Sequence, residues 1–301
     1  MPMNVASFKG LNNVTDPMRL GMDTLVRADN VNITYTGAIT KRKGYTLHIV
    51  GNVASAYSTL NYSRAYLIEG NTIKTIGGVQ IGSILDASSE MYWCEVNDDV
   101  YFNNGIDSGV IKPDHEILPW RESTLEDLKF LDAAGNELDS LLATLPVGTD
   151  VIQHWKGRMY AAQYMASEDQ TVIWFSRSLG YHLFNLDTDF VMVQGQVLML
   201  APHDSALIIG ADDAVYAYDG TSLAQIADYG VVPGQHWSSD ESRVLFWSQR
   251  GLCAALPFQN LTEKSVSVAP GVRAGGCVVR AGGQRRYLSV IQQGDLPFNA
   301  Y

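Results

Sequence analysis

The sequence predicts an all-β protein, and its pattern is best explained by a β-propeller of about five to six blades with an extended N-terminal arm. The chain has 301 residues, of which 46% are hydrophobic, so it can bury a large core. Its 27 Gly against 10 Pro, with 15 Tyr and 6 Trp, are typical of many short strands joined by tight turns. Runs of β-branched and aromatic residues, separated by Gly, Asn and Asp, recur along the chain.

Residues 1–50 differ from the rest and are predicted to form an arm with the first strands. Phe8–Asn13 is rich in turn-forming residues, and Asp16-Pro17 stops any helix. Residues 30–35, followed by Gly37, predict one strand and its turn. This strand has no evident adjacent partner, and open strand edges recruit other chains. We therefore expect the arm to dock on a neighbouring subunit or ring.

A basic cluster, Lys41–Lys43, ends directly before Gly44. This position favours a solvated hairpin turn, and a nucleic-acid patch is the alternative.

Residues 51–301 are predicted to form the propeller, because successive antiparallel hairpins follow one another there. Six hairpins are expected, at 65–69 with 72–76, 92–96 with 100–103, 151–155 with 158–164 and then 171–176, 206–210 with 214–218, 243–248 with 252–256, and 277–280 with 286–291. Their spacing of roughly 30 to 60 residues suits blades of about 40 to 45 residues with insertions. A sandwich of two sheets would give similar alternation.

A short helical insertion is predicted near 121–145. Ser123–Glu126 matches a capping box, and leucines follow it at positions 128, 131, 138, 141 and 142. We expect one or two short helices there.

The formal charge of −11, from 32 acidic and 21 basic residues, argues against a broad face that binds nucleic-acid phosphates. The acidity is compatible with an ordinary globular protein, a calcium binder, or a surface past which a polyanion slides. Cys94, Cys253 and Cys277 lack metal-ligand spacing and are predicted to be free, buried thiols. No secretion signal or membrane span is evident, so we expect synthesis in a cytoplasm.

Enzyme signatures are missing from the sequence. No G-x-S-x-G, phosphate-binding glycine loop or H-E-x-x-H motif occurs. His203-Asp204-Ser205 has the residue types of a triad, but neighbours on an extended strand point to opposite faces, so we expect no alignment. A glycosidase carboxylate pair from distant strands stays open. The prediction is a protein that is not an enzyme and has no cofactor and no bound metal.

Two further groups of residues have alternative interpretations. Asp98-Asp99 and Asp212-Asp213 could supply calcium ligands, but their order differs from a calcium loop and fits hairpin turns. The six Trp could stack on sugars in a groove, or pack between blades. Most of them lie inside strand runs, which favours the core. Trp155, Tyr160, Trp174 and Phe175 are predicted to share one blade core.

Three patches of sequence, taken in order, resemble phage tail nozzle and related podovirus-type tail β-propeller proteins. The first comprises 8–12, 16–17, 28–31 and 37–45, where a glycine-rich segment leads to a short strand and a basic-Gly turn. The second comprises 145–149, a Gly-Arg turn and blade strand at 154–162, a Trp-x-Ser strand at 172–176 and a His-aromatic loop at 181–185. The third is 216–220 with 229–234. This chain is shorter than known nozzles, and a ring at another level of the tail or neck is the alternative to a nozzle.

The resemblance implies a virion protein that forms a ring, usually a hexamer, through which the genome leaves. Expected partners are further copies of the chain, the portal and adaptor or other tail proteins, tail fibres or spikes, and genomic DNA that passes without specific binding. The residues predicted to serve assembly through the arm are Phe8, Leu11, Arg19, Lys41, Arg42 and Lys43. The residues predicted as carboxylates of the passage are Asp98, Asp99, Asp212 and Asp213. The alternatives are a carbohydrate-binding propeller that contacts a host surface and a glycosidase.

Overall fold

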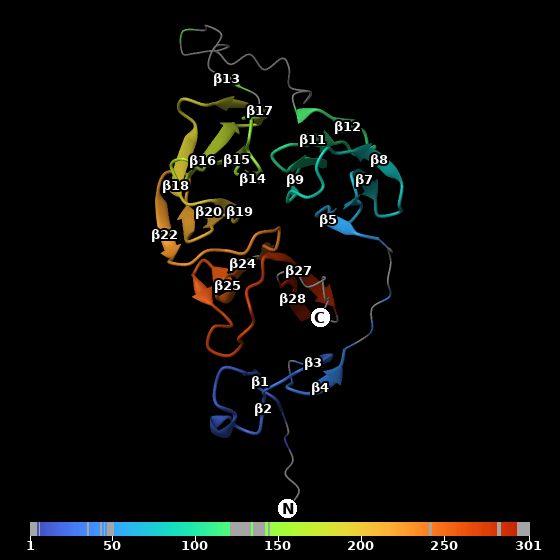
Figure 1. The fold of residues 1–301 in the computed structure, drawn as a ribbon, viewed down its shortest axis with the longest axis vertical. Helices are drawn as coiled ribbons and strands as arrows, with labels where there is room; N and C mark the ends of the chain where they lie inside the picture. The colour runs from blue at the N-terminus through green and yellow to red at the C-terminus, as the bar shows by residue number, and fades with distance from the viewer. Residues whose placement is uncertain are drawn as a thin grey trace, which may run out of the picture. The chain divides into compact units, whose positions relative to one another are not determined.

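The computed structural model describes residues 5, 7–34, 36–42, 44, 46, 51–120, 134, 142–143, 145–240, 243–281 and 284–293 (Figure 1). Its internal contacts divide the chain into two compact units. Unit 1 comprises Met1–Val50 and His236–Tyr301, and unit 2 comprises Gly51–Gln235. Each unit is described separately below.

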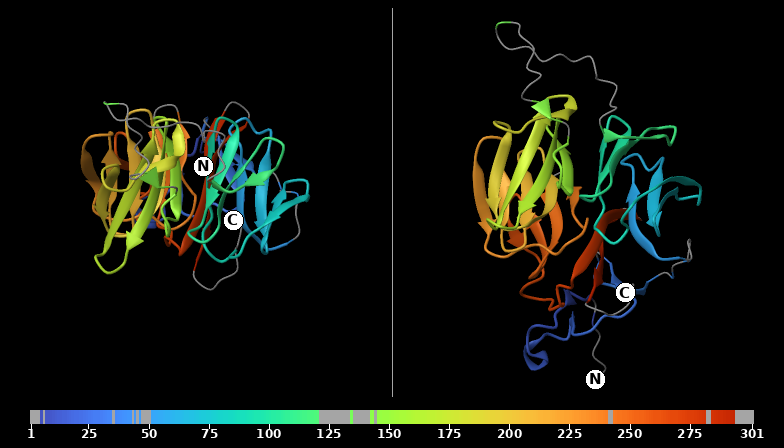
Figure 2. Two further views of the ribbon diagram at one scale, coloured as in Figure 1. Left: turned by 90° about the horizontal axis from the view of Figure 1, so that it is seen from above. Right: turned by 45° about the horizontal axis from the view of Figure 1, so that its top comes forward.

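Unit 2 consists of four successive antiparallel sheets, each a β-propeller blade (Figure 2), and in the first, second and fourth the strands follow in chain order from one edge. The first blade has the strands β5 (Val53–Ser58), β6 (Ala65–Glu69), β7 (Thr72–Thr75) and β8 (Gln80–Ser83). The second has β9 (Tyr92–Val96), β10 (Asp99–Asn103), β11 (Ser108–Ile111) and β12 (Ile117–Leu118). The fourth has β19 (Val197–Pro202), β20 (Leu207–Ala211), β21 (Val215–Tyr218) and β22 (Leu223–Ala227).

The third blade is larger because one of its strands pairs with several others. Its strands are β13 (Leu142–Ala143), β14 (Val151–Trp155), β15 (Arg158–Met165), β16 (Gln170–Arg177), β17 (Gly180–Asn185) and β18 (Phe190–Gln194). A register shift between Ser176 and Arg177 ends the regular ladder of β16, so that its far end pairs with β17 and the rest pairs with β18.

The core of unit 2 lies between neighbouring blades. One cluster joins the second, third and fourth blades and includes Trp155, Ile173, Phe184 and Leu207, each at most 4% exposed. A second cluster joins the first two blades through Ile73 and Trp93 and their neighbours. Strands buried on both faces explain the near-continuous apolar runs of the sequence, such as β20, which is buried throughout.

Unit 1 contains a four-stranded sheet and a long hairpin. The sheet comprises β23 (Ser238–Asp240), β24 (Arg243–Ser248), β25 (Gly251–Ala255) and β26 (Gln259–Asn260). The hairpin comprises β27 (Arg273–Ala281) and β28 (Gln284–Gln292). The arm adds a parallel pair, β1 (Gly10–Leu11) with β2 (Thr24–Leu25), an antiparallel pair, β3 (Val31–Ile33) with β4 (Ile39–Lys41), and the 3-10 turn η1 (Pro17–Arg19).

The all-β propeller class predicted from the sequence is confirmed, and all six predicted hairpins are present. Two expectations about the arm were wrong. β3 has a partner strand, β4, because Gly37 at φ 79° closes a tight turn between them. Lys41 lies in β4, and the amide of Arg42 donates to the carbonyl of Asn30, so this part of the basic cluster continues a strand. The predicted helical insertion near 121–145 lies almost wholly outside the described residues.

Candidate functional site

The turns at one end of the first two blades converge on the side chain of Arg64. Its guanidinium donates to the carbonyl oxygen of Asp98 and, at 3.3 Å, to that of Lys112. Beside it, the Tyr66 hydroxyl lies 3.1 Å from His115 Nδ1. Three turns from two blades, at 59–64, 97–98 and 112–116, are thereby held together. We call this end the Arg64 rim.

Asp98 and Asp99, predicted as passage carboxylates, belong to the Arg64 rim. Asn97 and Asp98 both have positive φ, at 51° and 68°, which fits a tight two-residue hairpin turn. Asp98 is exposed, whereas the Asp99 carboxylate accepts a hydrogen bond from Lys112 Nζ at 2.8 Å. The free carboxylate of this pair is therefore that of Asp98.

Asp212 and Asp213 form the exposed turn between β20 and β21. The Asp212 carboxylate accepts the amide of Gln196 at 2.9 Å. A Cβ on Gly230 would lie 2.0 Å from the Asp212 carbonyl oxygen, and a Cβ on Gly195 would lie 2.4 Å from its carboxylate. Glycine at both positions is what allows the chain to pass so close to this turn.

The structure does not bring the four predicted carboxylates together. Asp98 follows the first strand of its blade, while Asp212 follows the second strand of its own, so the two turns lie at opposite ends of the strands. Neighbouring blades run alike, since Trp155, at the end of β14 in the third blade, donates to the carbonyl of His203, directly after β19 in the fourth, at 2.6 Å. The pairs occupy opposite rims of unit 2.

The predicted assembly residues of the arm have different surroundings. The Phe8 amide donates to the Gly37 carbonyl at 2.8 Å, and Leu11 is half-buried in β1. Arg19, at the end of η1, and Lys41 are exposed, and Arg42 is half-buried. Lys43 lies outside the described residues. Docking of the arm on another subunit stays a prediction.

The arm is fixed within unit 1 by Asn13. Its side chain donates to the Ser267 carbonyl at 3.1 Å and accepts the Ser267 amide at 2.7 Å, and its own amide donates to the Ser265 carbonyl at 2.9 Å. This clamp joins segments 254 positions apart in the sequence. A sequence pattern offers no signal for such a pairing.

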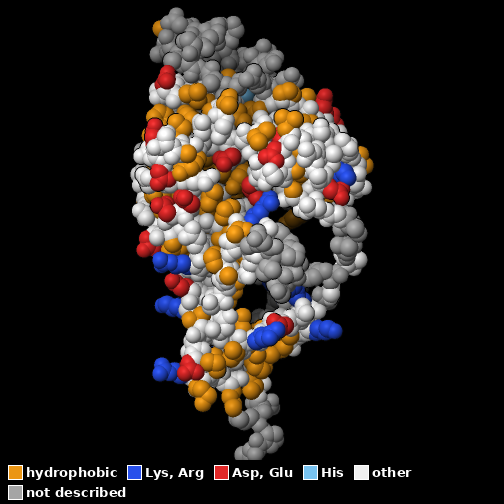
Figure 3. Space-filling model, in the orientation of Figure 1, with side chains coloured by type: hydrophobic (Ala, Val, Ile, Leu, Met, Phe, Trp, Pro, Cys, Tyr) orange, Lys and Arg blue, Asp and Glu red, His pale blue; other side chains and the backbone are white. Residues whose placement is uncertain are grey.

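Charge is divided unequally between the two units. Unit 1 carries 13 Lys and Arg against 7 Asp and Glu, while unit 2 carries 8 against 25, which gives formal net charges of +6 and −17. In Figure 3 the acidic side chains gather mainly over unit 2 and the basic ones over unit 1. The overall charge of −11 therefore conceals a basic unit, and the argument from net charge against phosphate-binding faces applies to unit 2 alone.

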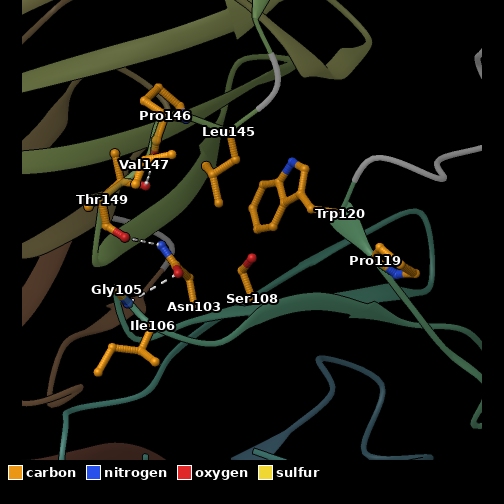
Figure 4. A pocket seen from close by; sticks show the side chains of 11 residues that line it. Asn103, Gly105, Ile106, Ser108, Pro119, Trp120, Leu145, Pro146, Val147 and Thr149 are labelled. Atoms are coloured by element: carbon orange, nitrogen blue, oxygen red, sulfur yellow. Dashed lines mark hydrogen bonds between the residues drawn. The ribbon is translucent and has the colours of Figure 1, made fainter. Parts of the chain in front are cut away.

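A pocket of about 250 Å³ lies between the second and third blades (Figure 4). Its wall includes Ile106, Trp120, Leu145 and Val147, and the side chain of Asn103 donates to the Thr149 carbonyl at 2.6 Å across it. Trp120 is only 3% exposed and donates from Nε1 to the Tyr181 carbonyl. Its ring faces are thus covered by protein, which leaves the pocket without an open stacking platform for a sugar.

The six Trp side chains belong mostly to the core, as the strand pattern predicts. Trp93, Trp120, Trp155 and Trp247 are 1 to 6% exposed, and Trp237 is half-buried. Of the four residues predicted to share one blade core, Trp155 and Tyr160 are buried. The other two, Trp174 and Phe175, are partly buried against the same cluster.

The assumption that residues 203–205 are extended was wrong. His203 Nδ1 and Ser205 Oγ lie 2.9 Å apart, because residues 203–205 form a turn and not the extended segment assumed above. The Ser205 amide also donates to Nδ1 at 3.3 Å, which is a local turn contact. Asp204, between them, is exposed.

Across the residues that the structure describes, no group of three or more His, Cys, Asp or Glu side chains could hold a metal ion. In the same residues, no helix is long and apolar enough to cross a membrane. Cys94 and Cys253 are buried, as predicted, and burial raises the pKa of the Cys94 thiol. The prediction was wrong for Cys277, which is exposed because it lies in the hairpin of β27 and β28.

No protein-family model matches the chain, and no curated protein is significantly similar to it. Among solved structures, it is similar to PorZ of the type-IX secretion system of Porphyromonas gingivalis (TM-score 0.39, 14% identity, 79% of this chain and 30% of that one). It is also similar to the extracellular domain of BT4673 from B. thetaiotaomicron (0.44, 9%, 80% and 32%) and to BBS1N in complex with ARL6DN (0.44, 13%, 84% and 80%). The chain spans about a third of the length of the first two.

Proposed function

We propose that this chain is a structural protein of a phage tail that assembles into a ring and lets DNA pass without binding it. The observation that carries the proposal is the charge of unit 2, with 25 acidic against 8 basic residues on a set of propeller blades. A wall of carboxylates repels a polyanion, so a passing genome meets no adhesive phosphate contacts. The three sequence patches that resemble tail nozzle proteins support the same role.

The two predicted carboxylate pairs would act at two levels of such a passage. Asp98 lies at the Arg64 rim, and Asp212 and Asp213 lie at the opposite rim. Asp99 is paired with Lys112 and contributes less to the field at its rim.

Electron microscopy of the purified protein tests the ring, and DNA release tests the passage. Virions that carry Asp98→Lys, Asp212→Lys and Asp213→Lys are expected to assemble but to release DNA slowly, with a strong salt dependence. Asp187→Lys, in the exposed turn between β17 and β18, is the matched control. Unchanged release at low salt would remove these residues from the passage, and monomers that bind a glycan array would favour the carbohydrate-binding alternative.

A further inference from the structure

The arm exposes an unusual set of large apolar side chains. Val14, Met18, Met22 and Val26 are 49%, 91%, 64% and 45% exposed. Three of them lie between β1 and β2, Val26 directly follows β2, and hydrophobic side chains gather over the arm in Figure 3. Arg19 is exposed within the same segment. We call these five residues the arm patch, which is apolar and includes one cation, Arg19, three residues from the exposed Asp16.

A second set lies on the Arg64 rim of unit 2. Leu60 and Tyr62, in the turn between β5 and β6, are 79% and 80% exposed, and Ile76 and Val79, in the turn between β7 and β8, are 48% and 63% exposed. The Ile76 amide donates to the Ala65 carbonyl at 2.9 Å, which places both turns at the same end of the blade. We call these four residues the rim patch.

Acidic side chains surround the rim patch. Asp98, Asp114 and Glu116 are exposed in the turns that Arg64 ties to the first blade. The rim patch is therefore apolar and acidic. Clustered exposed apolar side chains mark interaction surfaces, and charges of opposite sign direct which surfaces meet.

We propose that the arm patch of one copy docks on the rim patch of a second copy. The net charges of +6 for unit 1 and −17 for unit 2 favour this pairing over contacts between like units. Because the two surfaces differ, the contact is head-to-tail, and repeating it closes a ring or extends a filament. The inference deepens the proposed ring, but it depends on self-association alone and requires neither DNA nor a virion.

Disulfide trapping between two variants tests the contact on the full chain. Cys277, the exposed thiol, is first replaced with Ser. Protein with Met18→Cys is then mixed with protein with Tyr62→Cys, and a cross-linked dimer is expected on a non-reducing gel. Asp213→Cys, on the opposite rim, is the matched control and should give no dimer with Met18→Cys. Equal trapping at both positions, or none at Tyr62→Cys, would overturn the proposal.

Charge reversal gives a second readout that does not depend on cysteine chemistry. Asp114→Lys with Glu116→Lys should reduce the sedimentation coefficient to that of a monomer, and so should Arg19→Glu. Mixing the two variants should restore association, and added salt should weaken it. Circular dichroism shows whether each variant is folded.

The outcomes separate this proposal from the ring function. A chain that stays monomeric at all concentrations, or whose unit 1 binds DNA while the chain does not self-associate, overturns the docking contact. Rings without the 18-to-62 cross-link overturn the contact and leave the ring in place. Head-to-tail oligomers whose virions release DNA independently of unit 2 charge overturn the passage and leave the contact in place.

Discussion

The indole Nε1 of Trp155 donates to the carbonyl oxygen of His203 at 2.6 Å. This hydrogen bond joins the third blade to the fourth at the ends of β14 and β19 that lie on the side of the Arg64 rim. The same ring packs against Tyr160 and Tyr218, with centroids 5.8 and 6.1 Å away. One side chain thus combines the burial and the polar contact that hold two blades together.

Trp155→Ala should lower the free energy of unfolding by about 3 to 5 kcal/mol, the usual cost of removing a buried Trp. Trp155→Phe keeps much of the buried area but leaves the His203 carbonyl without this donor, and should cost less, about 1 to 3 kcal/mol. Urea unfolding followed by fluorescence measures both. Equal losses for the two variants would show that the hydrogen bond, and not the packing, is the main contribution.

Gly230→Ala should destabilise unit 2, because the new Cβ would lie 2.0 Å from the backbone carbonyl oxygen of Asp212 and backbone cannot move aside cheaply. Gly77→Ala is the control, since its Cβ would meet only the Thr75 hydroxyl, at 3.8 Å. The thermal unfolding midpoint should fall for the first variant and stay near that of the parent for the second. A parental midpoint for Gly230→Ala would contradict this description of the turn.

Acid should loosen the turns that Asp86 and Asp219 organise. Hydrogen bonds from Ser88 and Ser89 lower the pKa of Asp86 to about 2, and those from Ser222 and Thr221 lower that of Asp219 to about 2. A lowered pKa stabilises the fold above the unfolded value, near 4, and the stabilisation is lost as the pH falls toward 2. Asp219→Asn should reduce the loss of unfolding free energy between about pH 4 and pH 2. An unchanged dependence of the unfolding free energy on pH would contradict the role given to Asp219.

Acidification from about pH 7 to pH 5 should lower the stability of the fold through His154. Burial lowers the pKa of this side chain, and its Nε2 has no hydrogen-bond partner among the described residues. The neutral ring is favoured in the fold, so stability is full above about pH 6.5 and falls as the pH drops below it. His154→Phe, which can keep the edge-on contact with Tyr181, should remove this slope from unfolding midpoints measured between about pH 7 and pH 5.

Loss of the Asn13 clamp should release the arm and leave the blades folded. Asn13→Ala removes both side-chain hydrogen bonds to Ser267, so hydrogen exchange at the Ser267 amide should accelerate. The amide of the buried residue Ile73, in β7 of unit 2, is the internal reference and should exchange as before. Unchanged protection at Ser267 would show that other contacts hold the arm.

The strands could be predicted from sequence because each hairpin has a local signal, which consists of alternating apolar residues and a turn such as Asn97-Asp98. Short outer strands such as β12 and β26 have two residues each, too few to show any period. Arg64 and Asn13 also carry no local signal, because their partners come from remote turns. The unequal net charges of the two units could not be predicted for a related reason, because unit 1 is formed from two distant stretches of the chain.

The clamp between Asn13 and Ser267 also imposes an order on biosynthesis. At about 5 to 20 residues per second, a ribosome makes Asn13 roughly 13 to 50 s before its partner 254 positions later. All of unit 2 lies between them in the sequence and can fold before Ser267 is made. Met18 of the arm is exposed during this interval. Nascent chains stalled after Gln235 should therefore show a protease-resistant unit 2 and a cleavable arm. When several ribosomes translate one mRNA, the exposed arm of one nascent chain would contact the folded blades of the chain that is being made ahead of it.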